Sequence, residues 1–196
     1  MILNEEFLRQ HNILAHSRFD NQETRILNEN QQIFEDAKKY DLFISHSYLD
    51  KSLILSLVEL FNKAGHSVYV DWINDPYLDR KAVNRQTAEL LRLRMNECKG
   101  LAYIATSNIV YSKWCPWELG YADGKKNGRC VILPILRTDS STYKGQEYLG
   151  LYPYIDCTKS SDHNYYNFWV NDPMVKNKYT SLKKWLAGGE LKEHDE

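Results

Sequence analysis

The sequence predicts a doubly wound α/β domain with a five-stranded parallel sheet. Short apolar runs of strand-forming residues alternate with segments whose apolar residues recur at helical spacing. These runs are apolar on both faces, which is typical of a parallel sheet that helices cover on both sides. Glycine follows lysine at three successive junctions. For a chain of 196 residues we predict the flavodoxin-like strand order 2-1-3-4-5.

The predicted strands are 41–45, 67–71, 101–105, 130–136 and 154–157, and the predicted helices are 50–63, 84–98, 112–126 and 175–186. A long polar loop is predicted at 72–81. The three junctions are Lys63-Ala-Gly65, Lys99-Gly100 and Lys126-Asn-Gly128. Lysine suits the negative end of a helix dipole, and glycine suits the left-handed position just past it. Each junction is therefore expected to end a helix and to open a strand.

Composition along the chain indicates three regions. Residues 1–38 are rich in Asn, Gln and Glu with scattered apolar residues, and we predict a mostly helical N-terminal extension. Residues 39–187 hold the alternating elements of the domain. Residues 188–196 are predicted to be a polar C-terminal tail.

Charge and cysteine usage argue against several classes of protein. The net charge of -1 gives no support to a nucleic-acid binder or a polybasic membrane surface. The first ten residues do not resemble a secretory signal, and the longest apolar run, Val131 to Leu136, is too short to span a bilayer. Four separated cysteines without a CxxC motif argue against a zinc site or a disulfide framework, so we expect reduced thiols in a cytoplasmic protein.

A ligand site is expected where the first and third strands end, because ligands of such sheets bind at this switch point. The first strand leads into Ser45-His46-Ser47, a polar surface that a ligand can approach closely. Alternatively, Ser47 or Asp50 only caps the helix that follows. Trp72 opens the loop after the second strand and is expected in a recognition loop, or else packed over the sheet edge.

The helix after the third strand carries the strongest candidates. Pro116 must lie in the first turn of this helix, which places its start near Ser112. Trp114 and Glu118 then lie four residues apart, about 40° from each other around the axis. A carboxylate beside an indole can anchor ribose hydroxyls. The alternative is that Trp114, Trp117 and Tyr121 are core residues and Glu118 is a solvated acid.

These segments resemble the TIR (Toll/interleukin-1 receptor) domain family over residues 39–187. Tyr40-Asp-Leu-Phe-Ile-Ser-His-Ser47 resembles the first box of the family, and Trp114-Cys-Pro-Trp-Glu118 matches its Trp-x-x-x-Glu signature. The loop after the second strand stands where the family has its BB loop. The resemblance implies the TIR fold.

The resemblance also implies NAD⁺ glycohydrolase chemistry, with NAD⁺ as the substrate and no cofactor or metal. Such enzymes cleave the nicotinamide–ribose bond and release ADP-ribose or a cyclic or conjugated derivative. By position, Glu118 is expected to be the catalytic carboxylate and Trp114 to stack against the ligand. The residues expected to border the pocket are Ser45, His46, Ser47 and, at the mouth of the BB loop, Trp72.

One departure leaves the phosphate contact unassigned. Many family members have an arginine soon after the first box, where this chain has His46 and Tyr48. The candidates are Lys51, Arg80, Lys81 and Arg85.

Among functions, the resemblance favours a signalling NADase similar to the Thoeris-type antiphage TIR proteins of bacteria. Its nucleotide product would activate a separate effector, and residues 1–38 would restrain the enzyme or mediate oligomerisation. The alternative is a non-catalytic scaffold that assembles through TIR surfaces, and self-association is expected of both. A receiver domain of the same fold would need clustered acids after the first strand, where this chain has Ser45-His46-Ser47.

Overall fold

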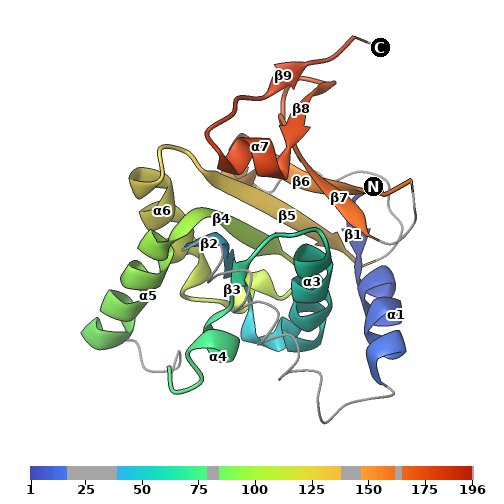
Figure 1. The fold of residues 1–196 in the computed structure, drawn as a ribbon. Coiled ribbons are helices and arrows are strands. Elements are labelled where there is room, and N and C mark those ends of the chain that lie inside the picture. The colour runs from blue at the N-terminus through green and yellow to red at the C-terminus, as the bar shows by residue number, and fades with distance from the viewer. Residues whose placement is uncertain (17–38, 79–83, 138–146, 162–164, 196) are drawn as a thin grey trace.

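The computed structural model describes residues 1–16, 39–78, 84–137, 147–161 and 165–195. Five parallel strands form the centre of one sheet (Figure 1) in the order β3-β2-β4-β5-β6. They are β2 (Tyr40–Ser45), β3 (Val68–Tyr69), β4 (Cys98–Ala105), β5 (Cys130–Leu136) and β6 (Tyr154–Lys159). This order confirms the predicted 2-1-3-4-5 topology.

Helices cover both faces of the sheet, as predicted. Helices α1 (Glu5–His16) and α3 (Lys51–Lys63) lie on one face, and α5 (Arg85–Glu97) and α6 (Cys115–Lys125) lie on the other (Figure 1). Successive side chains of a strand point to opposite faces, so Ile44 packs with the α3 core whereas Phe43 packs with the α5–α6 core. Strands β2, β3, β4 and β5 are therefore buried on both sides over most of their length, whereas β6 buries only the face of Ile155 and Cys157.

The N-terminal residues are built into the sheet. Strand β1 (Leu3–Asn4) pairs in parallel with β5, with Leu3 opposite Ile135, and Cys157 N of β6 donates to Met1 O at 2.9 Å. Leu3 and Leu8 are buried in the core of α3. The sequence predicted helix here but no strand. Residues 17–38 lie outside the described part of the chain, so the extent of the extension stays a prediction.

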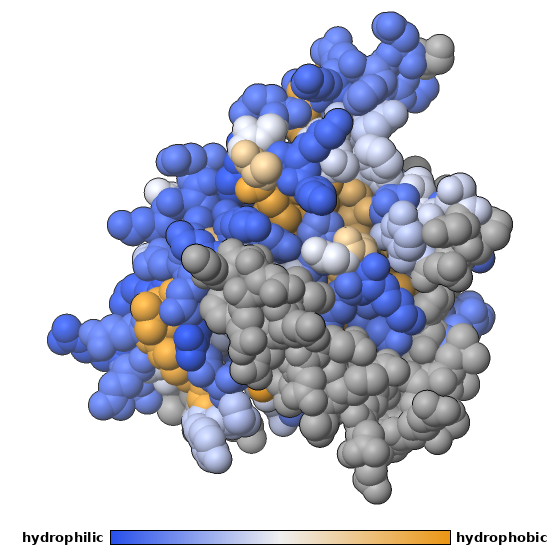
Figure 2. Space-filling view, viewed as in Figure 1, coloured by the Kyte–Doolittle hydropathy of each residue, from blue (hydrophilic) through white to orange (hydrophobic). Residues whose placement is uncertain are grey.

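Three antiparallel strands extend the sheet beyond β6. They are β7 (Tyr166–Asn171), β8 (Lys178–Ser181) and β9 (Lys192–Glu193), with helix α7 (Leu182–Leu186) between the last two. The predicted helix at 175–186 is therefore wrong before Leu182. Strand-forming Tyr179 and Thr180 pair with β7, and Ser181 begins the helix by accepting a hydrogen bond from Lys184 N at 3.4 Å. The surface of this projecting end is largely hydrophilic (Figure 2).

Two connections differ from the prediction at their starts. Helix α6 begins at Cys115 rather than near Ser112, after the 3₁₀ turn η2 (Ile109–Tyr111), and Pro116 lies in its first turn as predicted. The predicted loop at 72–81 opens with a short helix, α4 (Asp71–Asn74). Two further 3₁₀ turns are η1 (Tyr48–Asp50) and η3 (Glu147–Leu151).

The glycine junctions are confirmed at two of three positions. Gly65 and Gly128 have φ of 77° and 73°, the left-handed conformation expected after a helix. Gly100 is different, because α5 ends at Glu97 and Gly100 lies inside β4. A Cβ atom there would lie 2.9 Å from Arg129 O. Close approach of the neighbouring chain, rather than a helix end, therefore explains this glycine.

None of the described helices is long and apolar enough to cross a membrane. The four cysteines are buried and no disulfide joins them.

Candidate active site

The structure brings Ser45 and Glu118 together at the carboxyl edge of the central strands. Ser45 is the last residue of β2, and its Oγ donates a hydrogen bond of 2.6 Å to Glu118 Oε2. Both residues are buried, with an exposed fraction of 0%. Cys115, Leu119 and Ala122 of α6 pack into the core, and this packing turns Glu118 inward as well.

The burial of Glu118 decides between the two readings of this residue. It is not a solvated acid of the first helical turn, as one alternative held. A carboxylate that is shielded from water interacts more strongly with a nearby positive charge than a solvated one does. Glu118 is thus placed to stabilise a cation that enters the site.

Trp72 and His46 form a second, partly buried contact next to this pair. Trp72 Nε1 donates to His46 Nε2 at 3.0 Å, and His46 Nδ1 lies 3.0 Å from Ile44 O. An Nε2 that accepts and an Nδ1 that donates describe the neutral imidazole. Asp71 Oδ1 is 3.7 Å from the same Nε2. Trp72 also packs against the core of α3, so the alternative that it packs over the sheet is confirmed alongside its position beside His46.

Ser47 and Asp50 hold the loop between β2 and α3. Ser47 Oγ accepts a hydrogen bond from Leu49 N at 3.4 Å, so it caps the 3₁₀ turn η1 rather than helix α3. Asp50 makes no capping bond with its side chain. Instead its buried carboxylate accepts bonds of 2.6 Å from both Thr106 Oγ1 and Asn108 Nδ2. It therefore joins the loops that follow β2 and β4.

Thr106 and Asn108 were missed by the sequence analysis. Both follow directly after the third strand of the central sheet, and this position is the signal that could have found them.

Trp114 is a core residue in this structure. It is 9% exposed and packs edge-on against Trp117, with ring centroids 5.3 Å apart. Trp117 stacks on Tyr121 at 5.9 Å, and the Arg92 guanidinium lies 5.1 Å from its ring centroid. The core alternative thus holds for Trp114, and Trp117 has a packing role. Stacking of Trp114 on a ligand stays a prediction.

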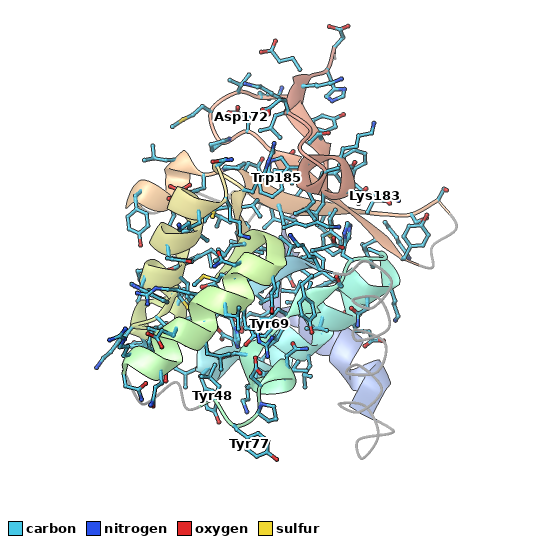
Figure 3. All side chains as sticks on the ribbon, turned by 60° about the vertical axis from the view of Figure 1, so that its left-hand side comes forward. Tyr48, Tyr69, Tyr77, Asp172, Lys183 and Trp185 are labelled. Atoms are coloured by element: carbon cyan, nitrogen blue, oxygen red, sulfur yellow. The ribbon has the colours of Figure 1, made fainter. Side chains whose placement is uncertain are left out.

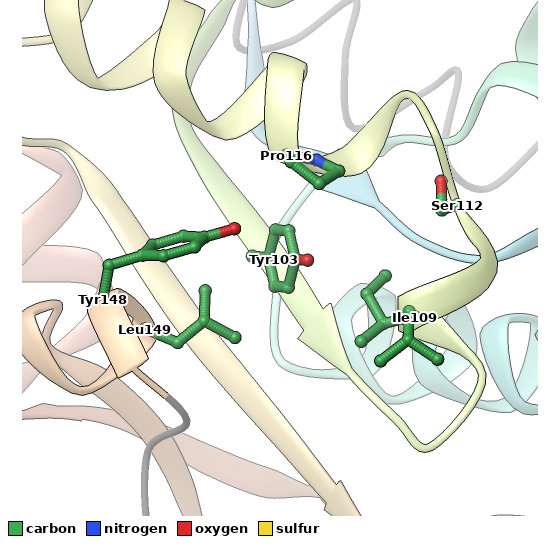
Figure 4. A pocket seen from close by; sticks show the side chains of 7 residues that line it. Tyr103, Ile109, Ser112, Pro116, Tyr148 and Leu149 are labelled. Carbon is green, nitrogen blue, oxygen red and sulfur yellow. The ribbon is translucent and has the colours of Figure 1, made fainter.

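A cavity of about 510 Å³ lies beside α6 (Figure 4). It contains none of the six predicted site residues. Its lining side chains are Tyr103, Ile109, Val110, Ser112, Pro116, Tyr148 and Leu149. Pro116 and Glu118 are two residues apart, and so about 160° apart around the helix axis. The cavity and the carboxylate therefore lie on different flanks of the same helix.

The candidate phosphate contacts have different surroundings. Lys51 Nζ lies 4.5 Å from the ring centroid of Tyr48 and 4.6 Å from that of Trp72. Arg85 is exposed and forms an ion pair of 2.7 Å with Glu89. Arg80 and Lys81 lie outside the described residues. No three His, Cys, Asp or Glu side chains group as metal ligands within the described ranges.

Comparison with known proteins shows what the chain is similar to. A protein-family model described as "TIR domain" matches residues 42–168. A Bacillus cereus (strain MSX-D12) protein, provisionally named 3′ cyclic ADP-D-ribose synthase ThsB′, is 41% identical over 162 residues, 82% of each chain. A Cytobacillus dafuensis protein, provisionally named cyclic ADP-D-ribose synthase TIR2, is 38% identical over 89 residues. That match covers 45% of this chain and 24% of the relative.

Proposed function

This chain belongs to the TIR domain family, and on that premise we propose that it cleaves the nicotinamide–ribose bond of NAD⁺ with Glu118 as its catalytic carboxylate. The observation that carries the proposal is the buried Ser45–Glu118 pair at the carboxyl edge of β2. Ligands of doubly wound sheets bind at this edge.

The reaction needs a negatively charged carboxylate, and it needs no general acid to protonate the leaving group. When the bond between ribose C1′ and the pyridinium nitrogen breaks, its electron pair passes to the nitrogen, and neutral nicotinamide leaves. The ribose becomes an oxocarbenium ion, and a nearby carboxylate stabilises this positive charge. In our proposal Glu118 supplies the negative charge, and Ser45 orients it through the 2.6 Å hydrogen bond.

The second step decides the product. If water attacks C1′ and gives up a proton, ADP-ribose results. If a nucleophile within the same ADP-ribose attacks and loses its proton, the ring closes. Because the relatives are named cyclic ADP-D-ribose synthases, we propose that this enzyme also forms a cyclic product. Exclusion of water by buried side chains favours that outcome.

The cyclic product suits a signal in bacterial antiphage defence that activates a separate effector. We propose that the enzyme acts in the cytoplasm, uses NAD⁺ as substrate and requires no cofactor or metal. His46, Ser47, Trp72 and Trp114 are proposed to border the substrate.

Access to the carboxylate requires movement. Glu118 is fully buried, so surrounding side chains have to shift before a ribose can touch it. Self-association through TIR surfaces is a proposed way to bring about this shift, with activity that rises steeply with protein concentration.

The test is to incubate concentrated protein with NAD⁺ and to separate the products by chromatography. Wild type is expected to release nicotinamide and a cyclic ADP-ribose, and Glu118→Gln to release neither. Glu193→Gln, which changes an exposed acid of β9 in the same way, is the matched control and is expected to behave as wild type. Absence of nicotinamide from wild type at every concentration would exclude the enzyme and leave the TIR–TIR scaffold.

A further inference from the structure

We propose that Lys51 binds the diphosphate of NAD⁺. This inference rests on the proposed function, because it names the group that holds the substrate's anionic centre while Glu118 acts on the nicotinamide ribose. The residue lies at the start of α3, directly after the loop that carries Ser47 and Asp50.

Two aromatic rings fix the position of the Lys51 ammonium. Its Nζ is 4.5 Å from the ring centroid of Tyr48 and 4.6 Å from that of Trp72. Cation–π contacts of this length hold a cation without taking its charge away. The long side chain therefore loses part of its freedom before a ligand arrives, which lowers the entropic cost of binding.

The charge of Lys51 is not balanced by an ion pair within the described part of the chain. The nearest acid in the sequence, Asp50, is engaged instead by Thr106 and Asn108, at 2.6 Å each. Asp71 is buried beside His46. The ammonium can thus donate to phosphate oxygens, and charge-assisted bonds of this kind are stronger than neutral ones.

The position of Lys51 matches the order of groups in the substrate. Its ring partner Trp72 is hydrogen-bonded to His46, and the residue before His46 is Ser45, which contacts Glu118. Two hydrogen bonds, one peptide bond and one cation–π contact therefore link the Glu118 carboxylate to the Lys51 ammonium. In NAD⁺ the diphosphate is attached to the nicotinamide ribose, so a ribose at Glu118 would direct the diphosphate toward Lys51.

The other described cations near this edge are less suited to the role. Arg85 is exposed and paired with Glu89 at 2.7 Å. Lys113 precedes α6, is exposed, and makes no ion pair or ring contact with the described residues. Without such contacts its side chain has to be ordered entirely by the ligand.

The test compares NAD⁺ with nicotinamide riboside, which lacks the diphosphate together with the adenosine attached to it. Lys51→Met removes the charge but keeps an unbranched apolar side chain against the rings. For NAD⁺ we expect KM to rise roughly 10-fold, the loss of one charge-assisted hydrogen bond, with kcat little changed. For nicotinamide riboside, which has no phosphate, we expect kcat/KM of the variant to equal that of wild type. Lys51→Arg is expected to recover most of the affinity for NAD⁺.

Two lysine variants serve as controls. Lys113→Met removes a charge at the same edge, and Lys183→Met removes one from α7, at the far end of the molecule from Tyr48 (Figure 3). Both are expected to keep the wild-type KM. Equal losses on NAD⁺ and nicotinamide riboside in Lys51→Met, or an unchanged KM for NAD⁺, would overturn the proposal. A KM increase in Lys113→Met in place of Lys51→Met would do the same.

A binding measurement separates this proposal from the proposed function. Calorimetry with ADP-ribose needs no turnover and is made on Glu118→Gln with and without Lys51→Met. Weaker binding in the double variant supports the Lys51 assignment even if wild type releases no nicotinamide, and equal binding contradicts it. If Lys51→Met does not fold, Lys51→Gln replaces it in both measurements.

Discussion

Ser45 Oγ and Glu118 Oε2 are 2.6 Å apart, in a contact that joins the end of β2 to the first turn of α6 and has no exposure to solvent. The two residues are 73 positions apart in the chain. The catalytic carboxylate of the proposed mechanism is thus also part of the packing between sheet and helix. Stability and activity should therefore respond together when this contact is changed.

Ser45→Ala is expected to lower the free energy of unfolding by about 1–3 kcal/mol, because the buried Glu118 carboxylate loses a hydrogen-bond donor. Nicotinamide release should fall as well, since the carboxylate is less well oriented. Denaturant unfolding and chromatography measure the two effects. Ser56→Ala is the control, because Ser56 Oγ donates only to Ser52 O within α3, at 3.3 Å. An equal loss of stability in both variants would argue against a special role for the Ser45 contact.

Asp75→Asn is expected to destabilise the protein at neutral pH and to matter less in acid. Burial alone would raise the pKa of Asp75, but hydrogen bonds from Arg94 and Tyr69 outweigh it and hold this pKa below its usual value. The folded chain therefore binds fewer protons at Asp75 than the unfolded chain. The contribution is complete above the unfolded pKa of about 4 and is lost as the pH falls through the lower, folded pKa.

Urea unfolding between pH 7 and pH 3.5 (roughly the range around the unfolded carboxyl pKa) checks this dependence. The difference in unfolding free energy between wild type and Asp75→Asn should shrink toward the acid end. Asp195→Asn, at an exposed position near the C-terminus, should show no difference from wild type at any pH. A constant gap between wild type and Asp75→Asn would disprove the assignment.

Gly100→Ala and Gly120→Ala are expected to have opposite effects on the melting temperature. A Cβ atom at Gly100 would lie 2.9 Å from Arg129 O and 3.2 Å from Leu186 Cδ2, and overpacking of this kind costs about 1–3 kcal/mol. Gly120 lies inside α6 with nothing within 4 Å of the new atom. There alanine should stabilise the helix by about 0.5–1 kcal/mol. Thermal unfolding of both variants measures the two effects. A lower melting temperature for Gly120→Ala would contradict the expectation that a Cβ atom at this position meets no neighbour.

Leu3→Ala is expected to cost about 2–5 kcal/mol, the usual loss for a buried leucine, because Leu3 is 2% exposed in the core of α3. Leu151→Ala, at a position 70% exposed, should be nearly neutral by comparison. Chemical denaturation measures both. A neutral Leu3→Ala would mean that β1 contributes little to the stability of the sheet.

The central five strands were predictable because each contains a short run of strand-forming apolar residues, and for the first four a helix precedes or follows that run. Strand β1 and the strands that follow β6 were not predictable in this way. Strand β1 spans only Leu3–Asn4 and is held by its pairing with β5, so no local periodicity marks it. A helix was predicted over 175–186, but pairing of Val170 with Thr180 draws residues 178–181 into the sheet. Tertiary pairing outweighed local preference in both cases.

The site was partly predictable for the same reason. Strand order placed Ser45 and Glu118 at one edge, and the structure brings them into contact. Spacing alone did not show that Glu118 points inward while Trp114 packs against Trp117. The orientation of α6 depends on how Cys115 and Leu119 fill the core, and that packing is not encoded in the spacing of one helix.

The placement of β1 constrains the order in which the chain can fold. Strand β1 occupies a slot between β5 and Cys157 of β6, so its partners emerge from the ribosome long after β1 itself. Until then Leu3 and Leu8 cannot pack into the core that they occupy in the folded protein. Contacts between such distant parts of a sequence slow folding and lengthen the life of incomplete, aggregation-prone states. The docking of β1 is thus expected to be a late step of folding, and a chaperone that holds residues 1–8 until then would speed recovery of the folded protein.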